Sequence, residues 1–363
     1  MSLINRLSVR LQNHPKRVVF PEGADVRILQ AARQYATRRL GTPILVGNRS
    51  RIKINAARLN IKLEGIRIVE PERSEDFPGY LVKFRGHQRF SGLDEHEAAD
   101  YLRNPNYFAA MMVATGGADA IVAGAMTNPA SGLRAIMQIL PRQAGIQTIS
   151  SMQVLEMAED SKFGANGTLF LSDCAIVPEP SAAQLCDIAT TTAMLARHLL
   201  NDTPRVALLA YCTKSSTTKS SSIDRVKAAT AATRERIKQL GVPVEVDGEL
   251  QVDVAIDPFS AATKGVESSV AGMANVLIFP DLNSANIASK MVQVLAGIPA
   301  YGQIISGLER PAAEVSRSSS AHDIFGTAVI TAAQAVERRF LHPFHADEPA
   351  PDTPPKRSAV PPS

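Results

Sequence analysis

Cysteine is scarce in this chain of 363 residues, which has only Cys174, Cys186 and Cys212 and no C-x-x-C pair. An odd number of cysteines without that spacing argues against a disulfide framework and against a structural zinc site. The zinc-protease motif H-E-x-x-H is also missing. We therefore expect a protein of the reducing cytoplasm that holds no metal ion.

Long apolar runs and blocks of one charge are missing as well. No stretch approaches the roughly 18 consecutive apolar residues that cross a bilayer, and the first 16 residues lack the apolar core of a signal peptide. The formal charge of +4 is spread along the chain, without a Lys/Arg block that could follow a phosphate backbone. We expect neither a membrane nor a nucleic acid as partner.

Short apolar runs alternate with helical patterns along most of the chain. In the helical pattern after the first run, Ile28, Ala31, Ala32 and Tyr35 recur at steps of three and four residues. This alternation indicates repeated βαβ units, and therefore an α/β fold with largely parallel sheets flanked by helices. The expected strands lie within residues 17–22, 42–48, 66–71, 119–125, 147–157, 167–177, 205–212, 275–281 and 300–308, and the clearest later helices span 181–200, 222–240 and 321–340.

The length suits two domains, because single cores stop growing at roughly 250–300 residues. The strands at 147–157 and 167–177 have no helix between them, which predicts a hairpin and a change of architecture near residue 150. The predicted organisation is a first α/β domain (1–150 and 305–341), a second α/β domain (151–304) and a cleft between them. Residues 342–363 contain seven prolines and few apolar side chains, so we expect a disordered tail.

The segment EVSRSSSAHDI, residues 314–324, is the most informative for chemistry because it leads into a predicted helix. Backbone amides, the hydroxyls of Ser316, Ser318 and Ser319, and the helix dipole could bind an anion there, while Arg317 grips two phosphate oxygens. The alternative is an ordinary helix start, capped by a serine and with Asp323 favoured by the dipole.

Further charged side chains occur where α/β proteins place ligands. Arg85 and Arg134 stand in loop-like contexts, the latter after the strand at 119–125, and either alone could be a solvated surface arginine. Asp173 lies inside an apolar strand, where a buried carboxylate needs a hydrogen-bonding partner, and either a structural bond or catalysis would explain it. Asp247 and Glu249 fit a turn just before a helix better than they fit a calcium loop.

Taken in order, several long segments resemble the phosphate acetyltransferase and butyryltransferase family. They are RVVFPEG, NPNYFAAMMVATGGADAIVAGA, NGTLFLSDCAIVPEPSAAQLCDIA, DGELQVDVAI, VAGMANVLIFPDLNSANIASK and the SR of VSRSSS, spread between about residues 17 and 340. The resemblance implies two α/β domains with the active site in the cleft between them, a homodimer, and reversible conversion of acetyl-CoA and phosphate into acetyl phosphate and CoA. It implies no cofactor, since CoA is a substrate.

The resemblance also assigns roles to residues. Arg317 corresponds to the arginine that holds the phosphate, Ser316 to a hydroxyl that steadies developing charge, and Asp323 to the base that deprotonates the CoA thiol. Arg85 and Arg134 match arginines that bind phosphate and CoA. These residue types suit the chemistry, because a thiol becomes nucleophilic when a carboxylate takes its proton and a tetrahedral intermediate needs fixed donors.

The chain departs from the family pattern inside this loop. Ser318 stands where the acetyl branch has glycine, and its Cβ is expected to crowd the backbone. The SRSSS pattern is closer to the butyryl branch, so a butyryl- or propionyltransferase is one alternative. A non-catalytic acetyl-CoA-sensing domain is another, although a sensor would have no need of the base Asp323.

Overall fold

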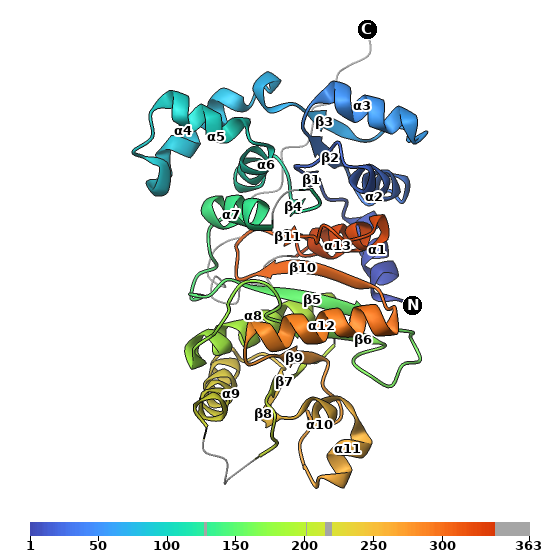
Figure 1. Ribbon diagram of the computed structural model, residues 1–363, viewed down its shortest axis with the longest axis vertical. Coiled ribbons are helices and arrows are strands. Elements are labelled where there is room, and N and C mark those ends of the chain that lie inside the picture. Colours follow the sequence, from blue (N-terminus) through green and yellow to red (C-terminus); the bar gives the residue numbers. More distant parts are fainter. Residues whose placement is uncertain (127–128, 201, 215–219, 338–363) are drawn as a thin grey trace, which may run out of the picture.

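The computed structural model describes residues 1–126, 129–200, 202–214 and 220–337. Eleven strands form one continuous sheet that runs the length of the molecule, with helices on both faces (Figure 1). The strands are β1 (Val18–Phe20), β2 (Pro43–Val46), β3 (Arg67–Val69), β4 (Ala120–Ala123), β5 (Ser150–Glu156), β6 (Thr168–Ser172), β7 (Arg205–Leu209), β8 (Glu245–Leu250), β9 (Val276–Ile278), β10 (Ala300–Ser306) and β11 (Ala312–Glu314).

The helices supply the outer layers. They are α1 (Leu3–Asn13), α2 (Val26–Thr37), α3 (Arg49–Arg58), α4 (Phe77–Gly86), α5 (Glu95–Arg103), α6 (Pro105–Ala114), α7 (Pro129–Ile139), α8 (Ala182–Leu200), α9 (Ser221–Leu240), α10 (Val252–Ile256), α11 (Pro258–Thr263), α12 (Leu282–Ala296) and α13 (Ala321–Ala333), with 3₁₀ turns η1 (Pro71–Arg73) and η2 (Gln88–Phe90). None of the described helices is long and apolar enough to cross a membrane.

The strand order is β3-β2-β1-β4-β11-β10-β5-β6-β9-β7-β8. The strands from β3 to β11 pair in parallel, and so do those from β6 to β8. Between these halves, β10 and β5 pair with each other and with their other neighbours in antiparallel fashion. The predicted largely parallel α/β architecture is therefore confirmed, and so is the hairpin of β5 and β6.

Each central strand is buried on both faces, which explains why the strand segments are short, continuous apolar runs. In β1, Val18 and Phe20 join a core with α1, α2 and α13, while Val19 joins a second core with α6 and α7. A third core lies between the second half of the sheet and α10 to α12. The boundary at residue 150 stays a prediction, since the described sheet continues from one half into the other.

Three details differ from the expectations or fall beyond the described chain. Helix α13 ends at Ala333 instead of residue 340, and Glu337 has a left-handed φ of 52° that a helix cannot contain. Asp247 and Glu249 lie within the edge strand β8, where both are buried, and not in a turn before a helix. The predicted disordered tail, residues 342–363, lies outside the described residues.

Candidate functional site

Three loops meet at the carboxyl ends of β1, β4 and β11. Because these neighbouring strands are parallel, their carboxyl ends share one edge of the sheet, where α/β proteins bind ligands. Glu22 after β1 accepts hydrogen bonds from the backbone amides of Ala125 (2.6 Å) and Met126 (2.8 Å) after β4. The amide of Val315, after β11, donates to the carbonyl of Ala123 (2.7 Å). The three loops are thus tied together by hydrogen bonds.

Gly124 permits this close approach of the β4 and β11 ends. Its φ is +105°, and a Cβ placed on it would lie 2.4 Å from the carbonyl oxygen of Val315 and 2.7 Å from Cγ of Glu314. Any side chain would therefore collide with the chain that leads into the serine-rich loop.

The segment from Ser316 to Ser320 forms a tight turn that leads into α13. The amide of Ser319 donates to the carbonyl of Ser316 at 2.9 Å, and the hydroxyls of Ser316 and Ser318 lie 2.9 Å apart. The expected crowding at Ser318 does not occur, because its side chain is exposed and its φ is not left-handed. Ser319 is half-buried, while Ser316 and Arg317 are exposed.

Arg317 carries the positive charge of this loop, and its side chain is exposed. Its guanidinium makes no hydrogen bond or ion pair with any residue that the structure describes, so its donors face solvent. Together with the hydroxyls and the N-terminus of α13, this arrangement can bind anionic oxygens.

Asp323 has the structural role that the sequence left open as an alternative. It is the third residue of α13 and forms a capping box with Ser320: the Ser320 amide and hydroxyl donate to Oδ2 at 2.9 and 2.8 Å, and the Asp323 amide donates to the Ser320 hydroxyl at 3.1 Å. These carboxylate bonds fall on Oδ2. Among the described residues no hydrogen bond is made to the other oxygen, Oδ1, which can accept a further partner.

Arg134 lies on α7, the helix that follows the β4 loop, and its side chain is exposed. The neighbouring amide of Leu133 donates to the carboxyl group of Glu314 at the end of β11, so α7 begins beside the serine-rich loop. Burial raises the pKa of Tyr107 on α6, and the positive charges of Arg134 and Arg89 oppose that shift. Arg89 in η2 is exposed, as Arg134 is, and its charge acts on the same tyrosine.

Arg85 stands apart from the loop. It lies on α4, which packs against α5 and α6 well away from α13 in Figure 1, and forms an ion pair with Glu95 at 3.6 Å. The structure thus brings Ser316, Arg317, Ser318 and Ser319 into one loop, with Asp323 in the first turn of α13 and Arg134 on an adjoining helix. No contact within the described chain links Arg85 to this loop.

Glu314 is a buried carboxyl group directly behind the loop. Its side chain has a solvent exposure of 5%, and Oε1 has no hydrogen-bond partner in the described structure. Burial raises its pKa to about 8, the Leu133 amide opposes this shift, and the charge of Glu22 adds to it. The folded protein therefore favours the protonated form of Glu314 near neutral pH.

This burial predicts a pH-dependent stability. A carboxyl group whose pKa is raised on folding stabilises the protein below its unfolded pKa, near 4.5, and that contribution is lost as the pH rises through about 8. Wild-type protein should lose stability over this window by on the order of a few kcal/mol relative to Glu314→Gln, which does not ionise. Urea unfolding of both proteins at pH 5 and pH 8.5 measures this difference, and parallel pH profiles would contradict it.

Asp247 and Glu249, which the sequence analysis placed in a turn, are buried acids of strand β8 in the other half of the sheet. Burial opposes ionisation of Asp247, but its bonds to Lys214 and other donors hold its pKa below the usual value, and Arg234 also pairs with it. Glu249 lies 3.8 Å from Lys227. A hollow of about 400 Å³ at the β8 edge has Lys214, Lys227, Arg234 and Glu249 among its lining residues. Asp173 is likewise satisfied, by Ser151 and the amides of residues 175–177.

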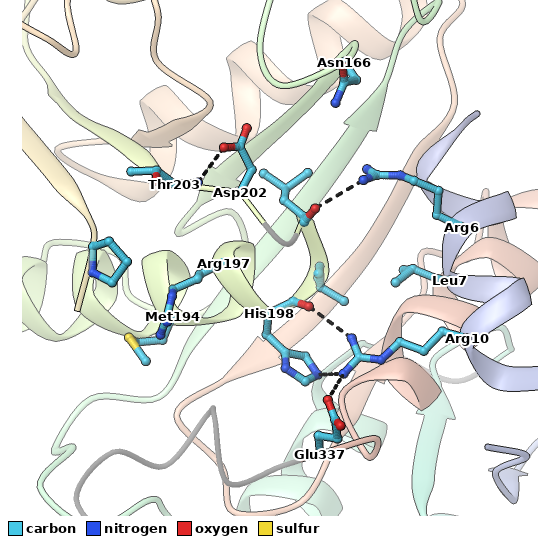
Figure 2. A pocket seen from close by; sticks show the side chains of 13 residues that line it. Arg6, Leu7, Arg10, Asn166, Met194, Arg197, His198, Asp202, Thr203 and Glu337 are labelled. Carbon is cyan, nitrogen blue, oxygen red and sulfur yellow. Dashed lines mark hydrogen bonds and ion pairs between the residues drawn. The ribbon is translucent and has the colours of Figure 1, made fainter. Parts of the chain in front are cut away.

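A larger hollow, of about 960 Å³, lies between α1 and the end of α8 (Figure 2). Two of its arginines are bound to the framework: Arg10 donates to the carbonyls of His198 and Val336 at 3.1 Å each and pairs with Glu337 at 3.6 Å, and Arg6 donates to the carbonyl of Leu200 at 3.2 Å. Burial, followed by the charge of Arg10, lowers the pKa of His198 to about 4, so this ring is neutral. None of the residues expected to bind substrate lines this hollow.

Comparison with known proteins identifies the chain's relatives. Residues 2–332 match the model of the family described as phosphate acetyl/butaryl transferase. A phosphate acetyltransferase of Acetivibrio thermocellus is 39% identical over 338 residues, covering 92% of this chain and 98% of the relative.

Two solved structures are similar in fold and sequence. The EutD phosphotransacetylase from Staphylococcus aureus has a TM-score of 0.83 and 31% identity, and a phosphotransacetylase from Streptococcus pyogenes has 0.82 and 34%. Each comparison covers 92% of this chain and 98% of the other. The chain therefore belongs to the phosphate acetyl/butaryl transferase family and is an acyltransferase.

Proposed function

We propose that this acyltransferase reversibly moves an acetyl group between CoA and inorganic phosphate, and that the segment from Ser316 to Asp323, a loop and the first turn of α13, is its catalytic site. The observation that carries this proposal is the exposed Arg317 guanidinium, free of partners in the described chain, among hydroxyls at the start of α13. The names of the relatives support acetyl as the transferred group. No cofactor is needed, because CoA is itself a substrate.

In the proposed direction toward acetyl-CoA, Arg317 binds two phosphate oxygens of acetyl phosphate. Oδ1 of Asp323 takes the proton of the CoA thiol, whose ordinary pKa of about 8.5 leaves it mostly protonated at neutral pH. The sulfur attacks the carbonyl carbon, and the Ser316 hydroxyl donates to the oxygen that becomes negative. The carbon–oxygen bond to phosphate then breaks, and phosphate leaves while Arg317 balances its charge.

Arg134 is proposed to bind a phosphate of CoA, because its side chain is exposed on the helix that begins beside the loop. Arg85 is proposed to bind a part of the substrate that extends to α4, where its guanidinium pairs with Glu95. Ser318 and Ser319 are proposed to support the phosphate through the loop's hydroxyls and amides.

Acyl transfer with a series of donors tests this proposal. Purified protein is mixed with CoA and acetyl, propionyl or butyryl phosphate, and thioester formation is followed. The proposal predicts the highest kcat/KM for acetyl phosphate, whereas a preference for butyryl phosphate would assign the chain to the other branch. Binding of acetyl-CoA in a calorimeter without turnover of any donor would contradict catalysis and support the sensing alternative.

A homodimer is also proposed, on the basis of an uncovered apolar face. On α12, Ile287, Met291, Val294 and Leu295 follow one helical face with exposures of 64%, 54%, 78% and 80%. A contiguous apolar face of this kind marks a protein–protein interface, and a second copy of the chain is the proposed cover.

The double substitution Val294→Asp and Leu295→Asp is expected to shift the protein to monomers, because it would bury carboxylates in the proposed interface. Val82→Asp serves as the control, since Val82 is a similarly exposed valine (73%) on α4. Sedimentation velocity reports the mass. A wild-type monomer, or a dimer that survives the double substitution, would contradict this interface.

A further inference from the structure

Arg27, the second residue of α2, uses its guanidinium to join three segments at the site. Nη1 donates to the carbonyl oxygens of Arg317 (2.6 Å) and Ser319 (3.0 Å), on the serine-rich loop. Nη2 donates to the carbonyl of Ala125 (2.6 Å), on the loop after β4. The carboxylate of Asp25 accepts hydrogen bonds from Nε (3.2 Å) and Nη2 (3.0 Å) of Arg27, and these two bonds fix the plane of the guanidinium.

The bonds to Arg317 and Ser319 fix the orientation of two peptide groups. In a trans peptide the carbonyl and the following amide point in opposite directions. In the peptide between Ser319 and Ser320, the carbonyl accepts a hydrogen bond from Arg27 on one side, and the amide donates to Oδ2 of Asp323 on the other. The carbonyl of Arg317 is held by Arg27, while the amide of Ser318 faces the Ser316 hydroxyl at 3.3 Å.

The bond to Ala125 extends this constraint to the loop that leads into α7. The amide of Ala125 donates to Glu22, so the β4 loop is held at its carbonyl by Arg27 and at its amide by Glu22. Arg27 therefore ties the loop of Arg317 to the end of the β4 loop at Ala125. The Arg27 side chain has an exposure of only 28%, and its donors point to protein acceptors.

We propose that Arg27 is a positioning residue for acyl transfer, which sets the Arg317 loop against the β4 loop without touching substrate. This inference rests on the proposed role of Arg317. A misplacement of about 1 Å in a reacting group can lower a rate about 100-fold, so a residue that fixes both loops controls turnover through geometry.

The test compares Arg27→Lys with Arg33→Lys. A lysine keeps the charge but cannot supply a planar fork that reaches four acceptors. Arg33 is a matched control, because it lies on the same helix and its Nη1 also donates to two loop carbonyls, of Lys62 and Glu64 at 2.8 Å each, away from the site. We expect kcat to fall about 10- to 100-fold for Arg27→Lys and less than about twofold for Arg33→Lys.

A double-mutant cycle separates positioning from general stability. If Arg27 acts through Arg317, Arg27→Lys added to Arg317→Ala should cost little further activity, because the group being positioned is already gone. Equal fold-losses in both backgrounds, or a kcat for Arg27→Lys that matches the Arg33→Lys control, would overturn the proposal. If Arg317→Ala itself retained full activity, the proposed catalytic site would fail instead, and the two failures are therefore distinguishable.

Asp25→Asn is a second variant in case Arg27→Lys does not fold. The amide oxygen can still accept the cap bonds from the amides of Arg27 and Ile28, but the two-pronged acceptor for the guanidinium is lost. We expect an intermediate loss of kcat with the same non-additivity toward Arg317→Ala. Wild-type turnover in a folded Asp25→Asn protein would count against positioning by this pair.

Discussion

Arg317→Ala is expected to lower kcat about 100-fold or more while leaving the unfolding temperature unchanged. Removing a group that stabilises charge in the transition state typically costs this much. Stability should be unaffected, because the guanidinium is exposed and has no partner in the described chain. Steady-state kinetics and thermal unfolding of the purified variant measure the two effects.

Two further variants define what Arg317 contributes. Arg317→Lys should recover part of the lost rate, since it restores a positive charge but not two parallel hydrogen bonds to phosphate. Arg58→Ala is the matched control, because Arg58 is an exposed arginine in the last turn of α3. Turnover by Arg317→Ala equal to that of Arg58→Ala would remove Arg317 from the site.

Asp323→Asn is expected to lower kcat by about 100-fold or more with little change in stability. The asparagine cannot take a proton from the thiol, and general-base contributions are typically of this size. Its amide oxygen can still accept the two hydrogen bonds from Ser320, so the helix cap is largely kept. Kinetics and urea unfolding report the two properties separately.

Ser320→Ala provides the opposite change at the same capping box. It removes the hydroxyl that the Asp323 amide uses, at a cost of about 1 kcal/mol, and leaves the carboxylate in place. A protein that loses stability but keeps most of its turnover is therefore expected. If Asp323→Asn retained wild-type kcat, the carboxylate would serve only as a cap.

Much of the fold could be predicted because both faces of its strands are buried. Continuous apolar runs such as 119–125 have few interpretations other than a central strand, and the missing helix between β5 and β6 marked the hairpin. The single sheet could not be predicted in this way. It depends on the pairing of β10 with β5 and of β11 with β4, and the strands of each pair are far apart in the sequence.

The acids of β8 show where local patterns mislead. Asp247, Gly248 and Glu249 together suggested a turn, because acids and glycine are unfavourable in an ordinary strand. In the structure Asp247 and Glu249 are buried and paired with lysine and arginine side chains from α9 and the preceding loop. These residues are stable in a strand only because of their tertiary contacts, and the local sequence does not indicate those contacts.

The site residues that are close together in the sequence could be predicted, and those that are far apart in it could not. Ser316, Arg317 and Asp323 lie within eight residues at a helix start, so their proximity follows from the chain itself. Arg27 lies 290 residues before Arg317, and its spacing marked only the polar side of a helix. Its bonds to loop carbonyls involve backbone atoms, which leave no pattern in side-chain identity.

A crystal structure of the protein with inorganic phosphate bound tests the central claim most directly. The account predicts phosphate oxygens within hydrogen-bonding distance of the Arg317 guanidinium and the Ser316 hydroxyl, at the start of α13. Phosphate bound only elsewhere, for example in the hollow beside Arg6 and Arg10 shown in Figure 2, would contradict it.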